Sequence, residues 1–423
     1  LDSGNVAVAN TGDALPSAAP STPDLAASSD SGTSNSDNIT NDNTPTFTGT
    51  AEANTIVRLY NATQQLGQAV ADGSGNWTIT TIAIGNGAHN IYARAIGGSG
   101  SLGATSLALI VTIDTVAPAQ PGLPDLAAAS DTGTSNTDNI TRNTTLAFTG
   151  SAEENSRIVF YVDGVQNGAE IAANGSGVWA GARVPGANAA HVVHVTARDL
   201  AGNTSIGSPT LSVTVDTTAP AAPSAPDLDT SADSGSSNTD NITNITTQVL
   251  NGSGGEAGAT VNVRTGLTTR CSATPAEGGS WSCSYVATAA AWTLTARQTD
   301  IAGNVSVSSV SISVTVDTTA PSTPSVPDLS AGSDLGSLNT DNITNDNTPT
   351  FTGTAETNAT ATLWMDGSAT ANTATATGGN YSITATTVAD GVHTFAARAT
   401  DAAGNNSAAD SATLSVTIDT VLP

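Results

Sequence analysis

The chain has 423 residues, a formal net charge of −26 and no lysine. Its 36 Asp and Glu residues face only 10 arginines, and charged residues make up 11% of the chain, against roughly 25% in a typical soluble domain. Sparse charge together with 38% hydrophobic residues argues against intrinsic disorder. The scarcity of basic residues argues against nucleic acid as a partner, and no apolar run is long enough to predict a transmembrane segment.

Internal repeats organise the sequence. The tripeptide Pro-Asp-Leu recurs with its Asp at positions 24, 125, 227 and 328. This period matches the length of a small independent domain and exceeds that of a solenoid repeat. We therefore predict the end of a preceding unit or linker at 1–13 and four domains at 14–115, 116–217, 218–318 and 319–423. Because the opening residues already have a strand pattern, we expect the chain to be a fragment of a larger protein.

Each repeat is predicted to contain short strands and no helix. In the first repeat, TPTFTGT alternates about Phe47, a Gly-rich turn leads into a strand at Trp77, and another strand contains Ile91. Leu109, Val111 and Ile113 then alternate before the repeat ends, as corresponding residues do in the other three repeats. About seven strands in about 100 residues are typical of an Ig-like sandwich.

The junctions between repeats are rich in proline, as in APAQPGLP, APAAPSAP and APSTPSVP. Proline fixes the backbone φ angle, so such linkers are stiff and extended. The predicted fold class is therefore all-β: four tandem Ig-like β-sandwich domains in an extended rod.

Acidic residues recur at six positions of the repeat, which together hold 24 of the 36 acids. In an up-and-down sandwich, the loop with Asp30 and Asp37 lies at the C-terminal end of repeat 1, beside Asp114. The loops with Glu153 and Asp199 lie at the N-terminal end of repeat 2. Crowded carboxylates raise one another's pKa, and no lysine is present to compensate them. Calcium, which takes six to eight oxygen ligands, is the expected counter-charge, and the lack of a Cys/His cluster disfavours zinc.

The candidate calcium ligands occupy the same seven positions at three junctions. They are Asp30, Asp37, Asn38, Asp114, Glu153, Asp199 and Asn203; Asp131, Asp138, Asn139, Asp216, Glu256, Asp300 and Asn304; and Asp233, Asp240, Asn241, Asp317, Glu356, Asp401 and Asn405. In the alternative interpretation, Asp and Asn occupy these loops because their side chains hydrogen-bond the local backbone. That interpretation explains one polar loop better than it explains acids on three loops at one end. The role of the Pro-Asp-Leu Asp stays open.

The motifs DTTAP, SDTGTSNTDNIT, TPTFTGTAE and RDLAGN together resemble the bacterial Ig-like domains of giant surface adhesins exported by type I secretion, among them ice-binding and biofilm adhesins. The resemblance covers essentially the whole chain. It implies an extracellular extender region at the bacterial cell surface. Calcium at the interdomain linkers would stiffen a monomeric rod, whose partners are calcium and the neighbouring repeats. The rod would project a distal adhesive domain for attachment or biofilm formation.

Repeat 1 departs from this pattern, since RAIGGSGS follows Arg94 where the other repeats have an Asp. We therefore expect the junction around Asp13 to bind calcium weakly or to join a different kind of unit. In repeat 3, Cys271 and Cys283 are placed to form a cross-strand disulfide within a hairpin, with a free or metal-binding pair as the alternative.

A second functional hypothesis is a binding module that contacts a carbohydrate or a surface protein directly. Exposed aromatic residues found in one repeat alone would mark its site, and Trp292 and Trp364 are the candidates. An enzyme is not expected, because the acids recur in every repeat and no nucleophile–base set is visible. The four histidines are too dispersed for a metal site.

Overall fold

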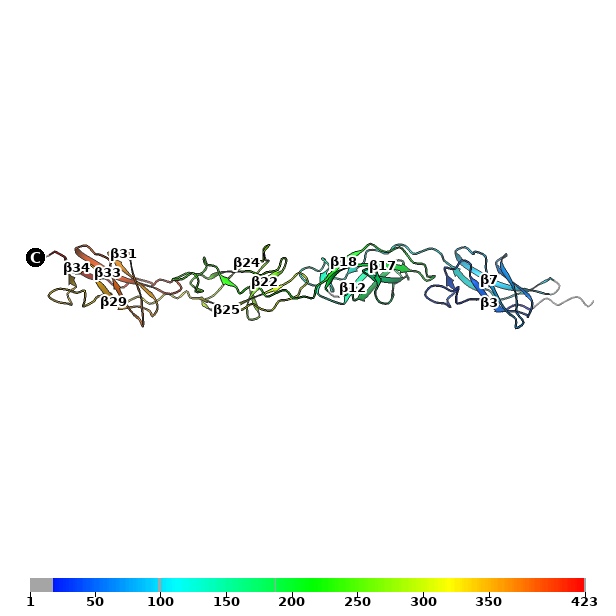
Figure 1. The fold of residues 1–423 in the computed structure, drawn as a ribbon, viewed down its shortest axis with the longest axis horizontal. Helices are drawn as coiled ribbons and strands as arrows, with labels where there is room; N and C mark the ends of the chain where they lie inside the picture. Colours follow the sequence, from blue (N-terminus) through cyan, green and yellow to red (C-terminus); the bar gives the residue numbers. More distant parts are fainter. Residues whose placement is uncertain (1–17, 98–99, 187, 422–423) are drawn as a thin grey trace, which may run out of the picture. The chain divides into compact units, whose positions relative to one another are not determined.

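The computed structural model describes residues 18–97, 100–186 and 188–421, which contain strands and no helix. The predicted segment 1–13, with Asp13, lies outside the described residues. The chain divides into two compact units, with the boundary in the sequence between Thr218 and Ala219; they are here called the N-terminal half and the C-terminal half. Each half contains two of the repeats, here called domains 1 and 2 and domains 3 and 4, which Figure 1 distinguishes by colour. In the described residues, no helix could cross a membrane.

Every domain is built from two sheets, which confirms the prediction of four tandem all-β Ig-like sandwiches. In domain 1 the small sheet has the order β1-β3-β6, and the larger sheet has the order β2-β9-β7-β4-β5 with β8 beside β7. The bounds are β1 Asp24–Leu25, β2 Ile39–Thr40, β3 Thr46–Thr50, β4 Ile56–Asn61, β5 Gln64–Val70, β6 Asn76–Thr80, β7 Gly87–Ile96, β8 Leu102–Thr105 and β9 Leu109–Ile113.

Domain 2 repeats this plan with a small sheet β10-β12-β16 and a larger sheet β11-β18-β17-β13-β14, in which β15 also pairs with β13. The bounds are β10 Asp125–Leu126, β11 Ile140–Thr141, β12 Leu146–Ser151, β13 Arg157–Val162, β14 Val165–Gln166, β15 Ile171–Ala172, β16 Val178–Arg183, β17 Ala189–Arg198 and β18 Leu211–Val215.

Domains 3 and 4 have small sheets β19-β21-β24 and β27-β29-β32 and larger sheets β20-β26-β25-β22-β23 and β28-β34-β33-β30-β31. In domain 3 the bounds are β19 Asp227–Leu228, β20 Ile242–Thr243, β21 Thr247–Gly252, β22 Thr260–Thr265, β23 Thr268–Ala273, β24 Trp281–Val286, β25 Ala290–Thr299 and β26 Ile312–Val316. In domain 4 they are β27 Asp328–Leu329, β28 Ile343–Thr344, β29 Thr350–Thr354, β30 Thr360–Met365, β31 Ser368–Thr375, β32 Asn380–Thr384, β33 Gly391–Thr400 and β34 Leu414–Ile418.

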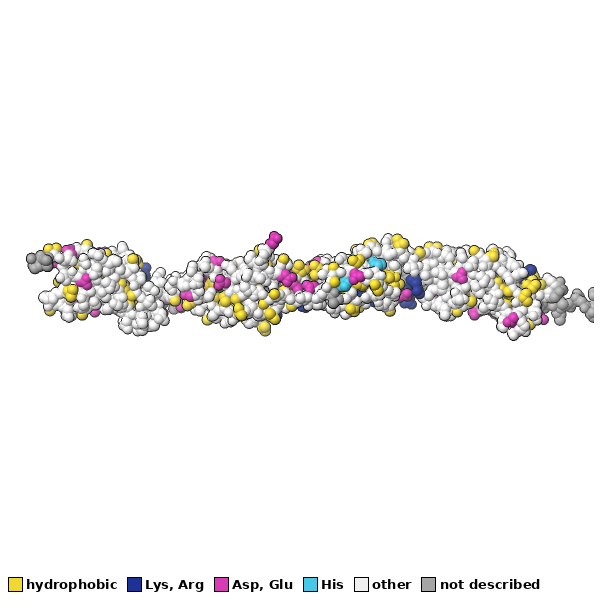
Figure 2. Space-filling model, viewed as in Figure 1, with side chains coloured by type: hydrophobic (Ala, Val, Ile, Leu, Met, Phe, Trp, Pro, Cys, Tyr) yellow, Lys and Arg dark blue, Asp and Glu magenta, His cyan; other side chains and the backbone are white. Residues whose placement is uncertain are grey.

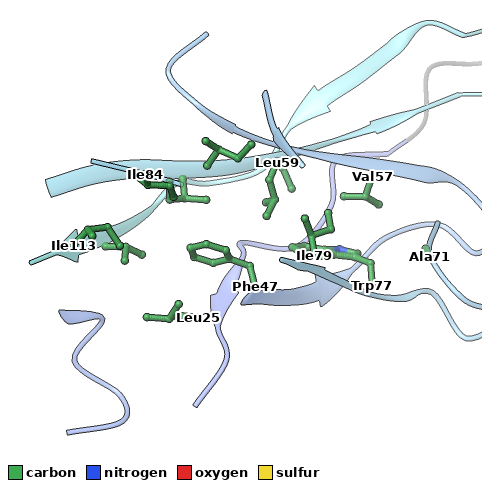
Figure 3. Packing of buried hydrophobic residues seen from close by; sticks show 13 residues of the cluster. Leu25, Phe47, Val57, Leu59, Ala71, Trp77, Ile79, Ile84 and Ile113 are labelled. Atoms are coloured by element: carbon green, nitrogen blue, oxygen red, sulfur yellow. The ribbon is translucent and has the colours of Figure 1, made fainter. Parts of the chain in front are cut away.

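The alternating apolar residues of the strands form one core in each domain. In domain 1, Phe47, Leu59 and Ile113 are at most 1% exposed, and Trp77 is 2% exposed. Figure 3 shows these side chains packed between the strands of the two sheets, where apolar surface is removed from water. The same alternation places every second residue of the strands outside the core, on the solvent side of its sheet.

The first part of each domain changes sheets, which the up-and-down scheme did not anticipate. In domain 1, β1 pairs with β3 of the small sheet, whereas β2 pairs in parallel with β9 of the larger sheet. The recurrent DNIT motif contains β2 and binds it to the end of the domain: the Asp114 N–H donates to Thr40 O and the Thr112 N–H to Asn38 O, both at 2.9 Å. The loop that carries Asp30 and Asp37 is thereby attached to the residue that ends the domain.

Candidate interdomain joints

In the N-terminal half, the loop after Asp30 contacts the loop after Arg198. Ser31 Oγ donates a hydrogen bond of 2.7 Å to Ala201 O, and the Thr33 N–H donates to Leu200 O at 3.3 Å. Asn203 Nδ2 donates to the carbonyl oxygen of Asp114 at 2.8 Å. The end of domain 1 is therefore joined to domain 2 by direct polar contacts between loops.

The C-terminal half contains the same joint between domains 3 and 4. Ser234 Oγ donates to Ala403 O at 2.7 Å, and Asn405 Nδ2 donates to Asp317 O at 2.8 Å. Two unrelated loops would not repeat the same donors, acceptors and distances by chance. The same joint therefore occurs once within each half.

Close backbone approach explains the glycine of the SDxG motif. Gly32 has a φ of 98°, and a Cβ there would lie 2.0 Å from Leu200 O. At Gly235, with a φ of 99°, the corresponding distance to Ala402 O is 1.9 Å. Any larger residue would both strain the backbone and push the two loops apart.

An arginine also lies at the N-terminal joint. Arg198 Nη2 donates to Gly32 O at 3.1 Å, and its guanidinium lies 3.5 Å from the Glu170 carboxylate. The sequence pattern did not predict this contact. The feature of the sequence that could have indicated it is the position of Arg198 directly before the predicted ligand Asp199.

A cavity of about 440 Å³ adjoins the N-terminal joint and is lined by four acidic residues. Three of them, Asp114, Glu153 and Asp199, are predicted ligands. The fourth, Glu154, was missed, although it directly follows the recurrent Glu153 in the sequence. Asp30 and Asp37 do not line this cavity. In the C-terminal half, the cavity beside the equivalent joint contains one acid, Asp401, and is not lined by Asp317 or Glu356.

Hydrogen bonds within the loops account for several predicted ligands, as the alternative interpretation expects. Asp199 Oδ1 accepts from the N–H groups of Gly202 and Asn203 at 2.7 and 2.9 Å, and its Oδ2 accepts from Asn203 Nδ2 at 2.8 Å. Asp37 Oδ1 accepts from the Ile39 N–H, and Asp114 Oδ1 accepts from the Val116 N–H. Asp401 and Asp300 accept the same bonds from Asn405 and Asn304.

The recurrent Asn of the DN pair has a conformational role. Asn38, Asn139, Asn241 and Asn342 all have φ between 59° and 60°. Asn tolerates this left-handed region better than most residues because its short polar side chain can hydrogen-bond locally. Its backbone N–H donates to the Asp of SDxG, as Asn38 does to Asp30 Oδ2 at 3.2 Å.

Asp30 is a predicted ligand with one carboxylate oxygen that its loop leaves without a donor. It is 5% exposed, and its Oδ1 has no hydrogen-bond partner in the described residues. Burial raises the pKa of Asp30, the Asn38 N–H opposes this rise, and the Asp37 and Asp24 carboxylates add to it. Asp131, Asp233 and Asp334 have the same unpartnered buried oxygen, and burial also raises the pKa of Asp131 and Asp233.

These donors fit a hard cation in chemistry, because carboxylate and amide oxygens are the ligands that calcium prefers. Among the described residues, however, no group of three or more His, Cys, Asp or Glu side chains is positioned to hold a metal ion. The structure thus offers unpartnered buried oxygens and an acid-lined cavity, without an assembled ligand set.

The remaining predicted ligands are divided between the two halves. In domain 2, Asp131 Oδ2 accepts from the Asn139 N–H, Asp138 Oδ1 from the Ile140 N–H, and Asp216 Oδ1 from the Thr218 N–H. In domain 3, the Glu256 N–H donates to Gln298 Oε1. In the C-terminal joint, Asp240 Oδ1 accepts from the Ile242 N–H, the Asn241 N–H donates to Asp233 Oδ2, and Glu356 Oε2 accepts from the Ser322 N–H.

A disulfide joins Cys271 to Cys283, with 5.8 Å between the Cα atoms. The expectation of a staple within a hairpin was wrong, because β23 belongs to the larger sheet of domain 3 and β24 to the small sheet. The bond therefore ties the two sheets together at one side of the sandwich.

Comparison with known proteins identifies the repeats. The model of a family described as bacterial Ig-like domain matches residues 17–115, 117–217, 219–318 and 320–420. No curated protein matches the chain at a significant level.

Among solved structures, a Ca2+-stabilized adhesin that helps an Antarctic bacterium to reach out and bind ice is 22% identical, with a TM-score of 0.35, and covers 95% of this chain and 99% of that one. A part of a 1.5-MDa bacterial ice-binding adhesin is 18% identical, with a TM-score of 0.28, over 71% and 98% of the two chains. Invasin, a bacterial integrin-binding protein, is 12% identical, with a TM-score of 0.25, over 89% and 76%. Scores at this level do not indicate a shared function.

The family matches together cover nearly the whole sequence, and each matched segment contains one complete two-sheet sandwich with its own core. The chain therefore belongs to the bacterial Ig-like domain family, of which it contains four consecutive members.

Proposed function

We propose that the chain is a structural spacer of a bacterial cell-surface adhesin, in which calcium bound near the interdomain joints restricts bending between domains. In this role it would lie outside the cell, after export by type I secretion, and would hold an adhesive domain away from the surface for attachment or biofilm formation. The observation that carries the proposal is the repeated joint. Ser31–Ala201 and Asn203–Asp114 in one half correspond to Ser234–Ala403 and Asn405–Asp317 in the other.

A repeated joint is what a spacer needs and what an enzyme does not. A spacer transmits position along the chain, so each domain must meet the next in a defined way. A catalytic site is needed once, whereas the joint loops, their glycines and their acids recur with the repeat. Domains of this family typically serve as structural modules, which agrees with this function.

Calcium would act on the groups that the protein leaves uncompensated. Asp30 and Asp233 each hold a buried carboxylate oxygen without a hydrogen-bond donor, at the base of loops that enter the joints. Asp114, Glu153 and Glu154 line the neighbouring cavity in the N-terminal half. A bound divalent cation would offset the free-energy cost of burying the Asp30 and Asp233 carboxylates. It would also offset the repulsion among the acids that line the cavity.

Small-angle X-ray scattering of the full chain, in calcium and then in excess chelator, tests the proposal. We expect the maximum dimension and the profile to change when calcium is removed, because the joints then bend more freely. The double variant Asp114→Asn/Glu153→Gln should change less, since part of its cation site is already lost. Glu277→Gln, at an exposed loop of domain 3, is the matched control and should behave like the unmodified chain.

Identical scattering profiles with and without chelator would show that calcium does not stiffen the joints. The family assignment and the direct hydrogen bonds of the joints would stand in that case, and a spacer held by protein contacts alone would remain.

A further inference from the structure

The solvent face of the larger sheet in domain 1 carries four adjacent cationic and aromatic side chains. Along β4 and β7, Val57, Leu59, Ile91 and Ala93 are fully buried, so the alternate residues face outward. Those outward residues are Arg58, Tyr60, Tyr92 and Arg94, here called the Arg–Tyr platform. Register places Arg58 directly opposite Arg94 and Tyr60 directly opposite Tyr92.

Local contacts hold the platform in place. The two tyrosine rings stack, with centroids 5.6 Å apart and an interplanar angle of 16°. Arg94 Nε and Nη2 donate to Gly103 O on β8 at 3.1 and 3.0 Å. Arg58 Nε donates to Gln68 Oε1 on β5 at 3.1 Å. Each guanidinium is therefore oriented by hydrogen bonds to neutral groups, and neither pairs with a carboxylate among the described residues.

Domain 2 also places two arginines directly opposite each other, Arg157 and Arg198, but Val159 and Thr196 separate them from the stacked Tyr161 and His194 rings, and Arg198 lies 3.5 Å from the Glu170 carboxylate. Among the described residues, no other domain combines an Arg–Arg pair that lacks a carboxylate partner with a stacked Tyr–Tyr pair. In the same register positions, the Arg–Arg and Tyr–Tyr pairs of domain 1 are replaced by Val159–Thr196 and Tyr161–His194 in domain 2, Asn262–Arg297 and Arg264–Thr295 in domain 3, and Thr362–Arg398 and Trp364–Ala396 in domain 4. In domain 4 the arginine is also neutralised, because Arg398 Nε donates to Asp410 Oδ1 at 2.5 Å. The platform is thus a feature of one domain and not a property of the repeat.

Folding alone does not account for the platform. Like charges directly opposite on neighbouring strands are destabilising. The chain has 10 arginines and a net charge of −26, so two uncompensated arginines side by side are unusual for it. None of the described strands in the larger sheet of domain 1 contains Asp or Glu. An anionic partner from outside the chain would neutralise the pair.

The aromatic half of the platform indicates the kind of anion. Arg58 and Tyr60, and likewise Arg94 and Tyr92, are two residues apart on their strands, so the two pairs lie about 7 Å from each other. Planar guanidinium groups bind carboxylates through parallel hydrogen bonds, and tyrosine rings offer a flat, mainly apolar surface with a polar tip. Gln65 and Gln68, exposed on the neighbouring strand, provide amides for hydroxyl groups.

We propose that the Arg–Tyr platform of domain 1 binds an acidic polysaccharide. The carboxylate of a uronic acid unit accepts hydrogen bonds from Arg58 and Arg94, and a sugar ring packs on Tyr60 and Tyr92. The proposal goes beyond the spacer function and does not depend on calcium at the joints.

Isothermal titration of the full chain with a hexasaccharide of alternating glucuronate and N-acetylglucosamine tests this inference. We expect binding that weakens with added NaCl, as it does for exposed charge pairs. Arg58→Gln and Arg94→Gln should each lower the affinity at least tenfold, while Arg58→Lys should retain more of it. Arg297→Gln is the matched control, because Arg297 has the same strand position and the same kind of backbone contact, to Ser306 O, but no tyrosines beside it. It should leave the affinity unchanged.

The comparison ligands are neutral maltohexaose and triglutamate, which carries the same number of side-chain carboxylates as the hexasaccharide. Equal binding of maltohexaose would overturn the role of the arginines, and equal binding of triglutamate would overturn the saccharide in favour of an acidic peptide. Absence of binding up to millimolar ligand, or full binding by an Arg58→Gln variant, would also overturn the proposal. Circular dichroism of each variant separates lost binding from lost folding.

Discussion

At the scale of single residues, Asp30 shows how one carboxylate can be both recurrent and unfavourable. Its Oδ2 accepts the Asn38 N–H and so shapes the loop, but its Oδ1 is buried without a donor. A buried polar atom without a partner costs about 1–3 kcal/mol, and more when it is charged. A residue kept at this position in all four domains therefore acts with a partner from outside the chain or is tolerated for its loop geometry.

The Asp30→Asn variant distinguishes these roles. Because burial raises the pKa of Asp30, the folded state binds the proton more tightly than the unfolded state. The favourable contribution is complete below the ordinary value of 3.8 and is lost as the pH rises through the raised pKa. We therefore expect Asp30→Asn to stabilise domain 1 at pH 7 in chelator and to reduce its stabilisation by calcium.

Hydrogen exchange of the Thr112 and Asp114 amides is the local measurement, because these groups bond β2 to β9 beside Asp30. Asp72 is the control with the opposite sign: the N–H groups of Asn76 and Ser74 lower its pKa, so its contribution is present above 3.8 and is lost as the pH falls. Asp72→Asn should weaken its turn with or without calcium. Slower unfolding of unmodified domain 1 than of Asp30→Asn in chelator would refute the buried-charge argument.

At the scale of elements, the contact between the two sheets is made differently in domain 3 than in domains 1 and 2. A Cβ at Gly67 of domain 1 would lie 2.7 Å from Ile79 Cγ2, and one at Gly181 of domain 2 would lie 2.3 Å from Ile171 Cδ1. Each of these domains thus pairs a glycine with an isoleucine across the sheets. Domain 3 places the Cys271–Cys283 bond between the corresponding strands β23 and β24. Side-chain packing in domains 1 and 2 and a covalent bond in domain 3 thus hold the two sheets together at the same place.

Replacing both cysteines by alanine should therefore destabilise domain 3 and no other domain. Closing a loop of this length contributes about 3 kcal/mol by the chain-entropy model. The variant Cys271→Ile/Cys283→Gly, which copies Ile171 and Gly181, should be more stable than the double alanine variant because it refills the space. Denaturant unfolding followed by tryptophan fluorescence measures both, since Trp281 and Trp292 lie in this domain. An unchanged midpoint for the double alanine variant would show that the bond is dispensable.

At the scale of the whole molecule, charge of the two signs is segregated. Eight of the ten arginines lie on strands of the larger sheets, and none of the described strands of those sheets contains Asp or Glu. Among the described residues, the acids lie in loops and junctions except for the Pro-Asp-Leu Asp of each domain, which lies on a short strand of the small sheet. Figure 2 shows the visible face as mainly white, with few charged atoms, in keeping with 11% charged residues. The net charge of −26 is thus concentrated at particular places and is not spread over the surface.

Calcium and sodium should therefore differ in their effect on thermal unfolding of the full chain. Monovalent salt only screens the repulsion between exposed carboxylates, whereas an ion that binds the folded state alone adds stability according to its concentration and affinity. We expect a few millimolar calcium to raise the melting temperature more than NaCl at equal ionic strength. Differential scanning calorimetry measures both, and equal shifts would reduce the effect of calcium to screening.

The sequence by itself determined the number of domains, their all-β class and their core positions. Repeated motifs and alternation along a strand are local properties, and a residue such as Phe47 is apolar for the same reason in every copy. Sequence also marked the loops of the joints, because Gly32 and Asn203 recur with their motifs. The sequence could not determine which carboxylates lie close together in space. An Asp in a turn looks the same in the sequence whether its oxygens accept hydrogen bonds from loop amides, as in Asp199, or one of them lacks a donor, as in Asp30.

The tertiary structure decided the features that depend on register and on contacts between distant segments. These include the sheet change between β1 and β2, the disulfide between sheets, and the Arg–Tyr platform. Arg58 and Arg94 are 36 residues apart in the sequence, and neither segment predicts that the other lies beside it. A shift of one residue in the pairing of β4 with β7 would turn these side chains to the opposite face. Only the folded sheet establishes that two arginines and two tyrosines form one surface.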